Sequence, residues 1–105
     1  MSSNRRIFKY PLEIADRQII KVPAGGIPLS IIEQRGDVVL YASVPEDNDP
    51  EITKDLEIHI VGTGHIIAFD TVNDFKFLGT VSVEGGQLIW HVFFKDHGYW
   101  PSGES

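Results

Sequence analysis

The side chains best suited to acid–base or metal chemistry are four histidines, because the chain has no cysteine. His65 follows a glycine-rich turn, Gly62-Thr63-Gly64, where main-chain amides can approach a ligand and an imidazole can donate or accept a hydrogen bond. Arg35 or Lys76 can add positive charge, so this turn is a candidate site for a small ligand such as a signalling nucleotide. The alternative is a plain turn whose glycines adopt positive φ. The segment is not a Walker loop, since it lacks the further glycines and the Lys-Ser/Thr pair.

The other three histidines have less favourable positions. His59 is interpreted as a surface residue of a strand, His91 as a hydrogen-bonded residue of the core, and His97 as part of a C-terminal tail. No two histidines have the spacing of a zinc site on one element. There is also no Gly-x-Ser-x-Gly nucleophile turn, and the serines fall within expected strands rather than on strained turns. The sequence therefore predicts no metal, no cofactor and no enzymatic activity.

Acidic side chains are concentrated in one short segment after Pro45. Within twelve positions this segment holds six of the fifteen acids, opposed only by Lys54: Glu46, Asp47, Asp49, Glu51, Asp55 and Glu57. One interpretation is a solvated loop, and the other is a patch that docks on a basic protein surface. A calcium loop of the EF-hand type is not expected, since the glycine at the sharp turn and the terminal glutamate are missing.

The size and composition are those of one small globular domain over residues 1–105, with an ordered core at about 5–95 and a loose tail at 96–105. The hydrophobic fraction of 42% is ordinary for a folded protein. The net charge of -6 argues against direct binding of nucleic acid, because phosphate neutralisation needs an excess of Lys and Arg. No stretch approaches the roughly 20 apolar residues of a membrane-spanning helix, and no signal peptide is visible. Together with the lack of cysteine, this favours a reducing cytoplasm and no membrane partner.

Short apolar runs separated by turn residues predict about seven β-strands. They are expected at residues 7–14, 18–22, 29–33, 38–44, 56–60, 77–83 and 88–94. Pro11 makes the first an edge strand, since proline cannot donate to a central ladder. Residues 15–17 are expected to form a hairpin turn between the first two strands, and the glycines within 84–87 to close the last hairpin.

The segments between these runs position the candidate residues. Residues 45–54 have no apolar period and are expected to be a solvated loop. Residues 66–75 are expected to be a loop with at most one short helical turn, because their β-branched residues are poor helix formers. Strands joined mostly as hairpins predict a mostly β fold, either a small antiparallel β-sandwich or a partly open barrel.

Five short segments occur in an order that resembles a family of short tailed-phage and prophage proteins. They are Lys9-Tyr10-Pro11-Leu12-Glu13-Ile14, Glu33-Gln34-Arg35-Gly36, Gly62-Thr63-Gly64-His65, Phe77-Leu78-Gly79-Thr80-Val81 and Trp90-His91-Val92-Phe93. The resemblance covers about residues 6–94, and the ordered set is specific although each piece is short. It implies a phage-infected bacterium as the setting, but no mechanism, because the family has no established activity. The acidic segment after Pro45 and the tail after Lys95 lie where variation is expected.

Three functions fit this setting. The first is an accessory protein in the host cytoplasm that binds and inhibits a host protein complex, as an anti-CRISPR or other anti-defence inhibitor does. Its acids would anchor a partner with a basic surface, and Tyr99 and Trp100 would add an aromatic hot spot. The second is a sponge for a signalling nucleotide at the Gly62–His65 turn, and the third is a structural or assembly part of the phage. An edge strand would also allow a homodimer.

Overall fold

The computed structural model describes residues 4–47 and 49–98 of the chain. Its elements follow one another in the order β1 (Arg5–Leu12), β2 (Arg17–Pro23), β3 (Ile27–Gln34), β4 (Asp37–Pro45), β5 (Thr53–Gly62), α1 (Phe69–Asp74), β6 (Lys76–Val83), the 3-10 turn η1 (Glu84–Gly86) and β7 (Leu88–Asp96). The seven expected strands are confirmed. The helical turn expected within residues 66–75 is the short helix α1.

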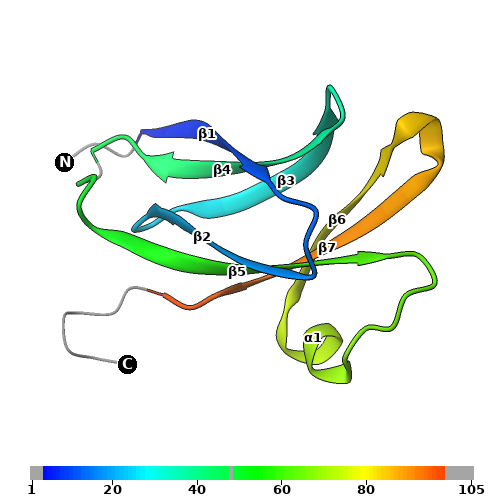
Figure 1. Ribbon diagram of the computed structural model, residues 1–105. Coiled ribbons are helices and arrows are strands. Elements are labelled where there is room, and N and C mark those ends of the chain that lie inside the picture. The colour runs from blue at the N-terminus through cyan, green and yellow to red at the C-terminus, as the bar shows by residue number, and fades with distance from the viewer. Residues whose placement is uncertain (1–3, 48, 99–105) are drawn as a thin grey trace.

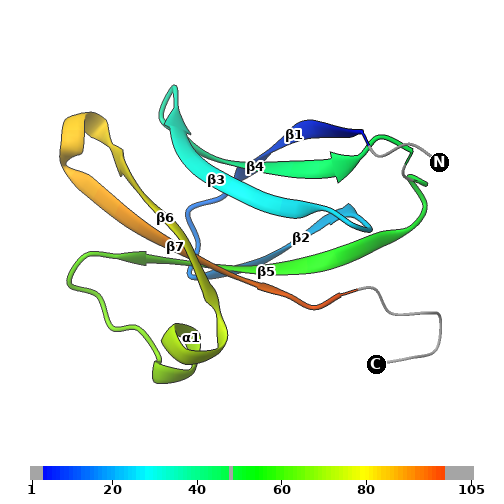
Figure 2. The ribbon, with the colours of Figure 1, turned by 180° about the vertical axis from the view of Figure 1, so that it is seen from behind.

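The strands form two antiparallel sheets that face each other (Figure 1, Figure 2). The smaller sheet has three strands in the order β1-β4-β3, and the larger has four in the order β2-β5-β7-β6. The sheets approach each other where β3 packs beside β6. A Cβ atom on Gly79 would lie 2.7 Å from the side chain of Ile31, so this close approach needs a glycine. The mostly β fold is therefore confirmed, in the form of an open two-sheet sandwich.

The expected hairpin between the first two strands is wrong, because β1 and β2 belong to different sheets. β1 pairs with β4 and lies at an edge, as Pro11 predicts, whereas β2 pairs with β5. The connection between them is closed by side-chain hydrogen bonds instead of a strand ladder. The Gln18 amide accepts from the main-chain N–H of Glu13 at 3.2 Å and donates to the Glu13 carbonyl at 2.7 Å. Residues 13–16 thus carry the chain from one sheet to the other.

Alternation along the central strands places one set of side chains between the sheets. In β5, Leu56, Ile58 and Ile60 point inward and are at most 3% exposed. They form one core cluster with buried side chains of both sheets, namely Leu12, Val22, Ile31, Val38, Leu40, Ala42, Val81, Val83 and Val92. Burial of this apolar set is the main force that holds the two sheets together.

β7 extends to Asp96, which lies opposite Leu56 of β5. The main-chain N–H of His97 then donates to the carbonyl of Asp55 at 3.0 Å. Asp96 therefore belongs to β7 and not to a loose tail, and His97 is held by Asp55, which belongs to β5 because this strand begins before residue 56. Residues 99–105 lie outside the described part of the chain.

The outer face of the larger sheet carries the polar members of the same strands. In the strand register, His59 of β5 lies between Arg17 of β2 and Phe93 of β7. Residues 63–75, which include α1, leave the end of β5 and fold back against this face (Figure 1). We call this segment the arm. The arm covers part of this sheet face.

Candidate functional site

Glu57 is the centre of a polar cluster on the outer face of the larger sheet. Its carboxylate accepts hydrogen bonds from Arg17 Nε at 2.7 Å, His59 Nε2 at 2.9 Å and His97 Nε2 at 2.8 Å. Burial alone would raise the pKa of Glu57, but these three hydrogen bonds outweigh it and lower the pKa from 4.5 to about 2. The carboxylate is therefore ionised at neutral pH and ties β2, β5 and residue 97 together.

His59 connects this cluster to the arm. Because the ionised Glu57 can only accept, His59 Nε2 carries the proton, and in the neutral imidazole Nδ1 accepts from the Thr71 hydroxyl at 3.1 Å. The imidazole also packs on the ring of Phe75 at 4.4 Å. His59 thus lies on the outer face of β5, as expected of a surface strand residue, but the arm covers this point and leaves its side chain only 20% exposed.

Thr71, His59 and Glu57 have the connectivity of a hydroxyl, an imidazole base and an orienting carboxylate. Catalysis would require the hydroxyl to meet a substrate, and Thr71 is only 5% exposed. The same contacts hold α1 against the outer face of the larger sheet. This geometry thus accounts for the position of the arm.

The Gly62–His65 turn begins the arm. Gly62 is buried, and a Cβ atom there would lie 3.0 Å from the His65 ring and 3.1 Å from Trp90. Gly64 has φ +87°, and the main-chain N–H of His65 donates to the Gly62 carbonyl at 3.0 Å. The two glycines therefore let the turn close tightly and place the exposed His65 ring edge-on to Trp90, with ring centroids 6.5 Å apart.

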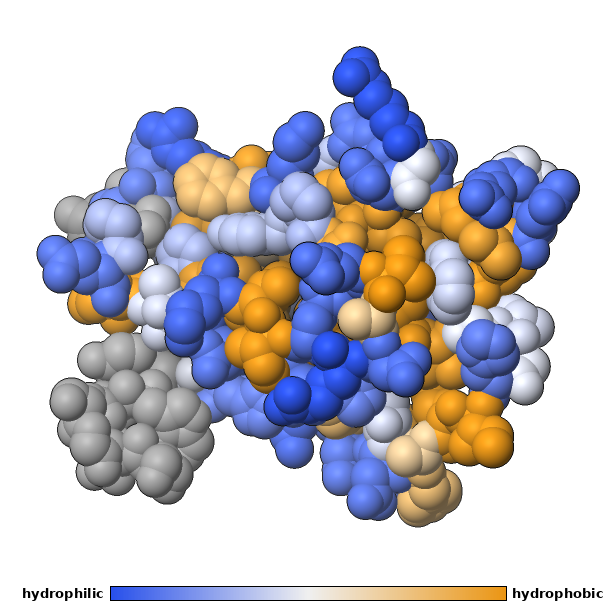
Figure 3. Space-filling model, in the orientation of Figure 1, coloured by the Kyte–Doolittle hydropathy of each residue, from blue (hydrophilic) through white to orange (hydrophobic). Residues whose placement is uncertain are grey.

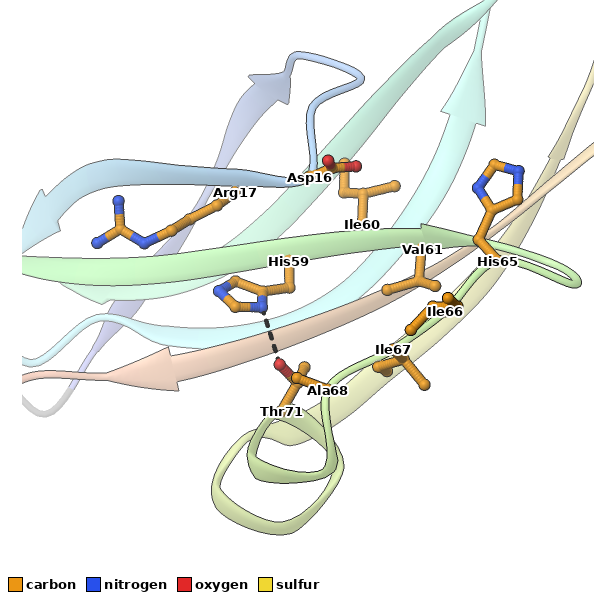
Figure 4. Close-up of a pocket in the computed structure, with 10 residues that line it drawn as sticks. All are labelled: Asp16, Arg17, His59, Ile60, Val61, His65, Ile66, Ile67, Ala68 and Thr71. Atoms are coloured by element: carbon orange, nitrogen blue, oxygen red, sulfur yellow. Dashed lines mark hydrogen bonds between the residues drawn. The ribbon is translucent and has the colours of Figure 1, made fainter.

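Three hollows adjoin this turn, and His65 lines all of them. The first, of about 250 Å³, lies between the arm and β2 and includes Asp16, Arg17, His59 and Thr71 (Figure 4). The second, of about 270 Å³, lies over the outer face of the sheet. The third, of about 150 Å³, is lined by Trp90, whose Nε1 is buried without a hydrogen-bond partner among the described residues. His65, at the end of the turn, therefore borders all three hollows.

His91 lies on this surface and not in the core as expected. Its Nε2 is 2.7 Å from the Thr63 hydroxyl and its Nδ1 is 3.0 Å from the Thr80 hydroxyl. Both ring nitrogens are therefore engaged, as the expectation of a hydrogen-bonded histidine required. Strand alternation explains the face, because Val92 next to it points into the core.

The structure brings together only part of the residues expected to bind a small ligand. Gly62, Thr63, Gly64 and His65 line the second hollow together. Arg35 lies at the β3–β4 turn, where it lines a different hollow with Lys9. Lys76 begins β6 and lines none of the hollows described around the turn. No cation from this expected set therefore stands beside the glycine turn.

The six acids expected to anchor a partner do not form one patch. Glu57 is engaged with its three donors, and Asp55 forms an ion pair with Lys21 at 2.8 Å. The remaining acids are exposed in the β4–β5 connection, at the opposite end of the molecule from the arm (Figure 1); they are Glu46, Asp47, Asp49 and Glu51. Glu46 there lies 3.7 Å from Arg6. The other expected anchors, Tyr99 and Trp100, lie outside the described residues.

The arm also exposes large apolar side chains that the sequence reasoning did not single out. Ile66 is 98% exposed, Phe69 76%, Val72 53% and the adjacent Phe77 of β6 58%. We call these four residues the arm patch; apolar side chains gather around α1 in Figure 3. The available signal was the apolar-rich segment 66–77, of which Thr71 and Phe75 contact His59 on the sheet. Asp70 and Asp74 of α1 are exposed beside the patch and have no ion-pair partner among the described residues.

Two further properties concern membrane-spanning helices and metal-binding groups. Among residues 4–47 and 49–98, no helix combines the length and the apolar character that crossing a membrane requires. In the same part of the chain, the His, Asp and Glu side chains form no group of three or more arranged to hold a metal ion.

Comparison with curated proteins and with solved structures found no match. A family model described as a domain of unknown function matches residues 3–100, which is nearly the whole chain and includes both sheets and the arm. The chain therefore belongs to the DUF7352 family, a domain of unknown function.

Proposed function

We propose that this protein is a phage-type accessory protein that binds a host protein complex and inhibits it, with the arm patch as its docking surface. The observation that carries the proposal is the exposure of Ile66, Phe69, Val72 and Phe77 on one short part of the chain. Exposed apolar patches on soluble proteins often mark sites of protein–protein contact. The resemblance of five segments to short phage and prophage proteins supplies the setting of an infected cell.

The chemistry of the patch indicates the kind of partner. The patch is uncharged and includes two phenylalanines, and interface cores are depleted of charged residues and enriched in aromatic ones. Its rim carries the unpaired carboxylates of Asp70 and Asp74, and the whole chain has a net charge of -6. The complementary surface is an apolar groove or segment flanked by Lys and Arg.

The acids of the β4–β5 connection have a different role in this proposal. They lie at the far end of the molecule from the arm, so they do not touch the same part of a small partner (Figure 1). Their charge still adds to the long-range attraction of a basic partner, which raises the association rate more than the affinity. The proposed docking residues therefore lie within residues 66–77 and not within the acidic segment 46–57.

The two other functions have less support in the geometry. A nucleotide sponge needs cations beside the glycine turn, and Arg35 and Lys76 lie elsewhere. A structural or assembly role in the phage has no distinguishing feature among the described residues. It predicts that the protein is present in purified phage particles.

The test has two stages. Tagged protein captures partners from bacterial lysate, and the captured protein is then purified and titrated with the wild type and with two matched double variants. Ile66→Ser/Phe69→Ser removes exposed side chains of the arm patch. Ile7→Ser/Ile27→Ser removes two isoleucines that are also more than half exposed but lie on the outer face of the smaller sheet.

We expect the arm variant to weaken the affinity by about tenfold or more, since two truncated apolar anchors at about 1 kcal/mol each exceed the roughly 1.4 kcal/mol of a tenfold change. The variant of the smaller sheet is expected to bind as the wild type does. In bacteria that carry the targeted complex, only the arm variant should lose the inhibition. Equal effects of both double variants on the purified partner would contradict docking on the arm. Loss of self-association by the arm variant on a sizing column would replace the host partner with a second copy of the chain.

A further inference from the structure

A separate hollow of about 260 Å³ lies on the outer face of the smaller sheet. It is lined by Lys9 and Pro11 of β1, Gln34 of β3, Arg35 of the β3–β4 turn, and Asp37 and Val39 of β4. Val39 lies between Val38 and Leu40, which are fully buried in the core, so it points to the opposite face. Asp37, two residues earlier, has the same orientation, and Pro11 lies opposite Val39 in the register. The hollow therefore opens away from the core and on the other sheet from the arm.

The hollow holds two positive charges and one negative charge, from Lys9, Arg35 and Asp37. None of these three side chains forms an ion pair or a hydrogen bond within residues 4–47 and 49–98. On the larger sheet, by contrast, the cations Arg17 and Lys21 of β2 pair with acids of β5. The charged groups at the hollow are therefore available to a ligand.

Arg35 has a backbone conformation that few arginines adopt. Its φ is +54° and that of Gly36 is +88°, which makes a two-residue hairpin turn with positive φ at both positions. Asn-Gly and Gly-Gly are the usual pairs in such a turn, because a larger side chain is strained there. No hydrogen bond or ion pair of the Arg35 side chain among the described residues offsets this strain. Strain that the fold does not offset is typical of residues placed for binding.

The remaining lining residues shield the hollow and add a donor. Val39 is only 4% exposed although it points away from the core, so the side chains around it keep water from the floor. Charge interactions are stronger where water is excluded. The Tyr41 hydroxyl donates to Gln34 Oε1 at 3.4 Å, which leaves the NH₂ group of Gln34 to donate to a ligand. The hollow thus offers cations and an amide donor to an anionic group, and one carboxylate to a cationic group.

We infer that this hollow binds a small zwitterion of the α-amino-acid class, with its carboxylate held by Lys9 and Arg35 and its ammonium group by Asp37. The guanidinium of arginine matches the two oxygens of a carboxylate. A simple anion would meet the charge of Asp37 and the field of a chain with a net charge of -6, whereas a zwitterion has no net charge to be repelled. The volume, below the roughly 300–1,000 Å³ of most small-molecule sites, suits a ligand of this size.

This site and the proposed partner contact are independent. The hollow shares no residue with the arm patch and lies on the other sheet. Either proposal can therefore fail without the other.

The experiment follows backbone amide signals of isotope-labelled protein during titration with four probes. L-Valine carries both charged groups, isovalerate only the carboxylate, valine methyl ester only the ammonium group, and inorganic phosphate is a simple anion. Valine is expected to shift the signals of Arg35, Gly36 and Asp37 and to bind at least about fivefold tighter than each other probe, the equivalent of one ordinary hydrogen bond. Absence of valine shifts at the turn would overturn the inference, as would isovalerate, the ester or phosphate binding as tightly as valine.

Two variants assign the charges of the site. Arg35→Asn removes a cation but suits the turn, so the variant should fold and bind valine about fivefold or more weakly. Asp37→Asn should weaken valine by a similar factor but not isovalerate, which has no ammonium group. Lys76→Met is the control, because it removes an exposed cation of β6 outside the hollow and should bind valine as the wild type does. Unchanged valine binding by both variants at the hollow would place valine elsewhere and reject the site.

Discussion

Replacing Glu57 with glutamine tests whether one carboxylate holds the outer face of the larger sheet together. Glu57 accepts from Arg17, His59 and His97 at 2.7 to 2.9 Å, and its side chain is only 13% exposed. Glutamine has the same shape, but its amide has one acceptor oxygen and an NH₂ group that would face donors. Glu57→Gln therefore removes the ionic hydrogen bonds without creating a cavity.

The pKa of Glu57 gives the size and the sign of the effect. Burial raises the pKa, and the hydrogen bonds from His59, His97 and Arg17 lower it further than burial raises it, from 4.5 to about 2. One pKa unit corresponds to about 1.4 kcal/mol, so the ionised carboxylate contributes about 3 kcal/mol to the free energy of unfolding. Because the folded-state pKa is lowered, this contribution is fully present above about pH 4.5. It is lost as the pH falls from there through about 2.

The assay is urea denaturation of wild type and variant at pH 7 and at steps down to about pH 3. We expect Glu57→Gln to lose about 3 kcal/mol at pH 7, and the difference from wild type to shrink below pH 4.5. Asp55→Asn is the control, because its ion pair with Lys21 is exposed on both sides and should contribute less than about 1 kcal/mol. A Glu57→Gln loss below about 1 kcal/mol at pH 7, or a difference that stays constant down to pH 3, would refute the reasoning.

Three further substitutions test the core, the Gly62–His65 turn and the contact that holds the arm on the sheet. Leu56→Ala opens a cavity at a fully buried position and should lower the free energy of unfolding by about 2–5 kcal/mol in a denaturant titration; a loss under 1 kcal/mol would contradict its central place. Gly62→Ala adds a Cβ atom against His65 and Trp90, so we expect a loss of about 1–3 kcal/mol and altered near-UV circular dichroism. Thr71→Val removes the hydroxyl that donates to His59, and amide exchange should accelerate in the arm but not in β5. Equal protection in both proteins would show that other contacts hold the arm.

Much of the fold is predictable from the sequence because strand alternation and turn residues are local signals. In β5, buried Leu56 and Ile58 flank Glu57, and Gly62 ends the strand as expected. Pro11 correctly marks β1 as an edge strand. The pairing of β1 and β2 was not predictable in this way. Two strands joined by a short segment form a hairpin or cross between sheets depending on long-range partners, and here β4 and β5 are those partners.

Less of the site is predictable, because its residues meet through the arm. Alternation places His59 on the outer face, but no periodic signal shows that residues 63–75 fold back to cover it. The Gly62–His65 turn was recognisable from its glycines, and the structure does gather these four residues at one hollow. The expectation that Arg35 or Lys76 adds positive charge at this turn depended on a proximity that a one-dimensional pattern does not contain.

The acidic segment shows why a charge count does not locate a binding surface. Register places Lys21 opposite Asp55 and Arg17 opposite His59, next to Glu57, so the acids of β5 are neutralised by their neighbours in β2. A shift of one residue in this pairing would turn the same cations to the other face and leave both acids free. Carboxylates on turns and on α1 lie outside the paired strands, so no neighbouring strand places a cation next to them. The acids available to a partner are therefore those that pairing leaves over, and in the arm they are Asp70 and Asp74, beside the exposed apolar side chains.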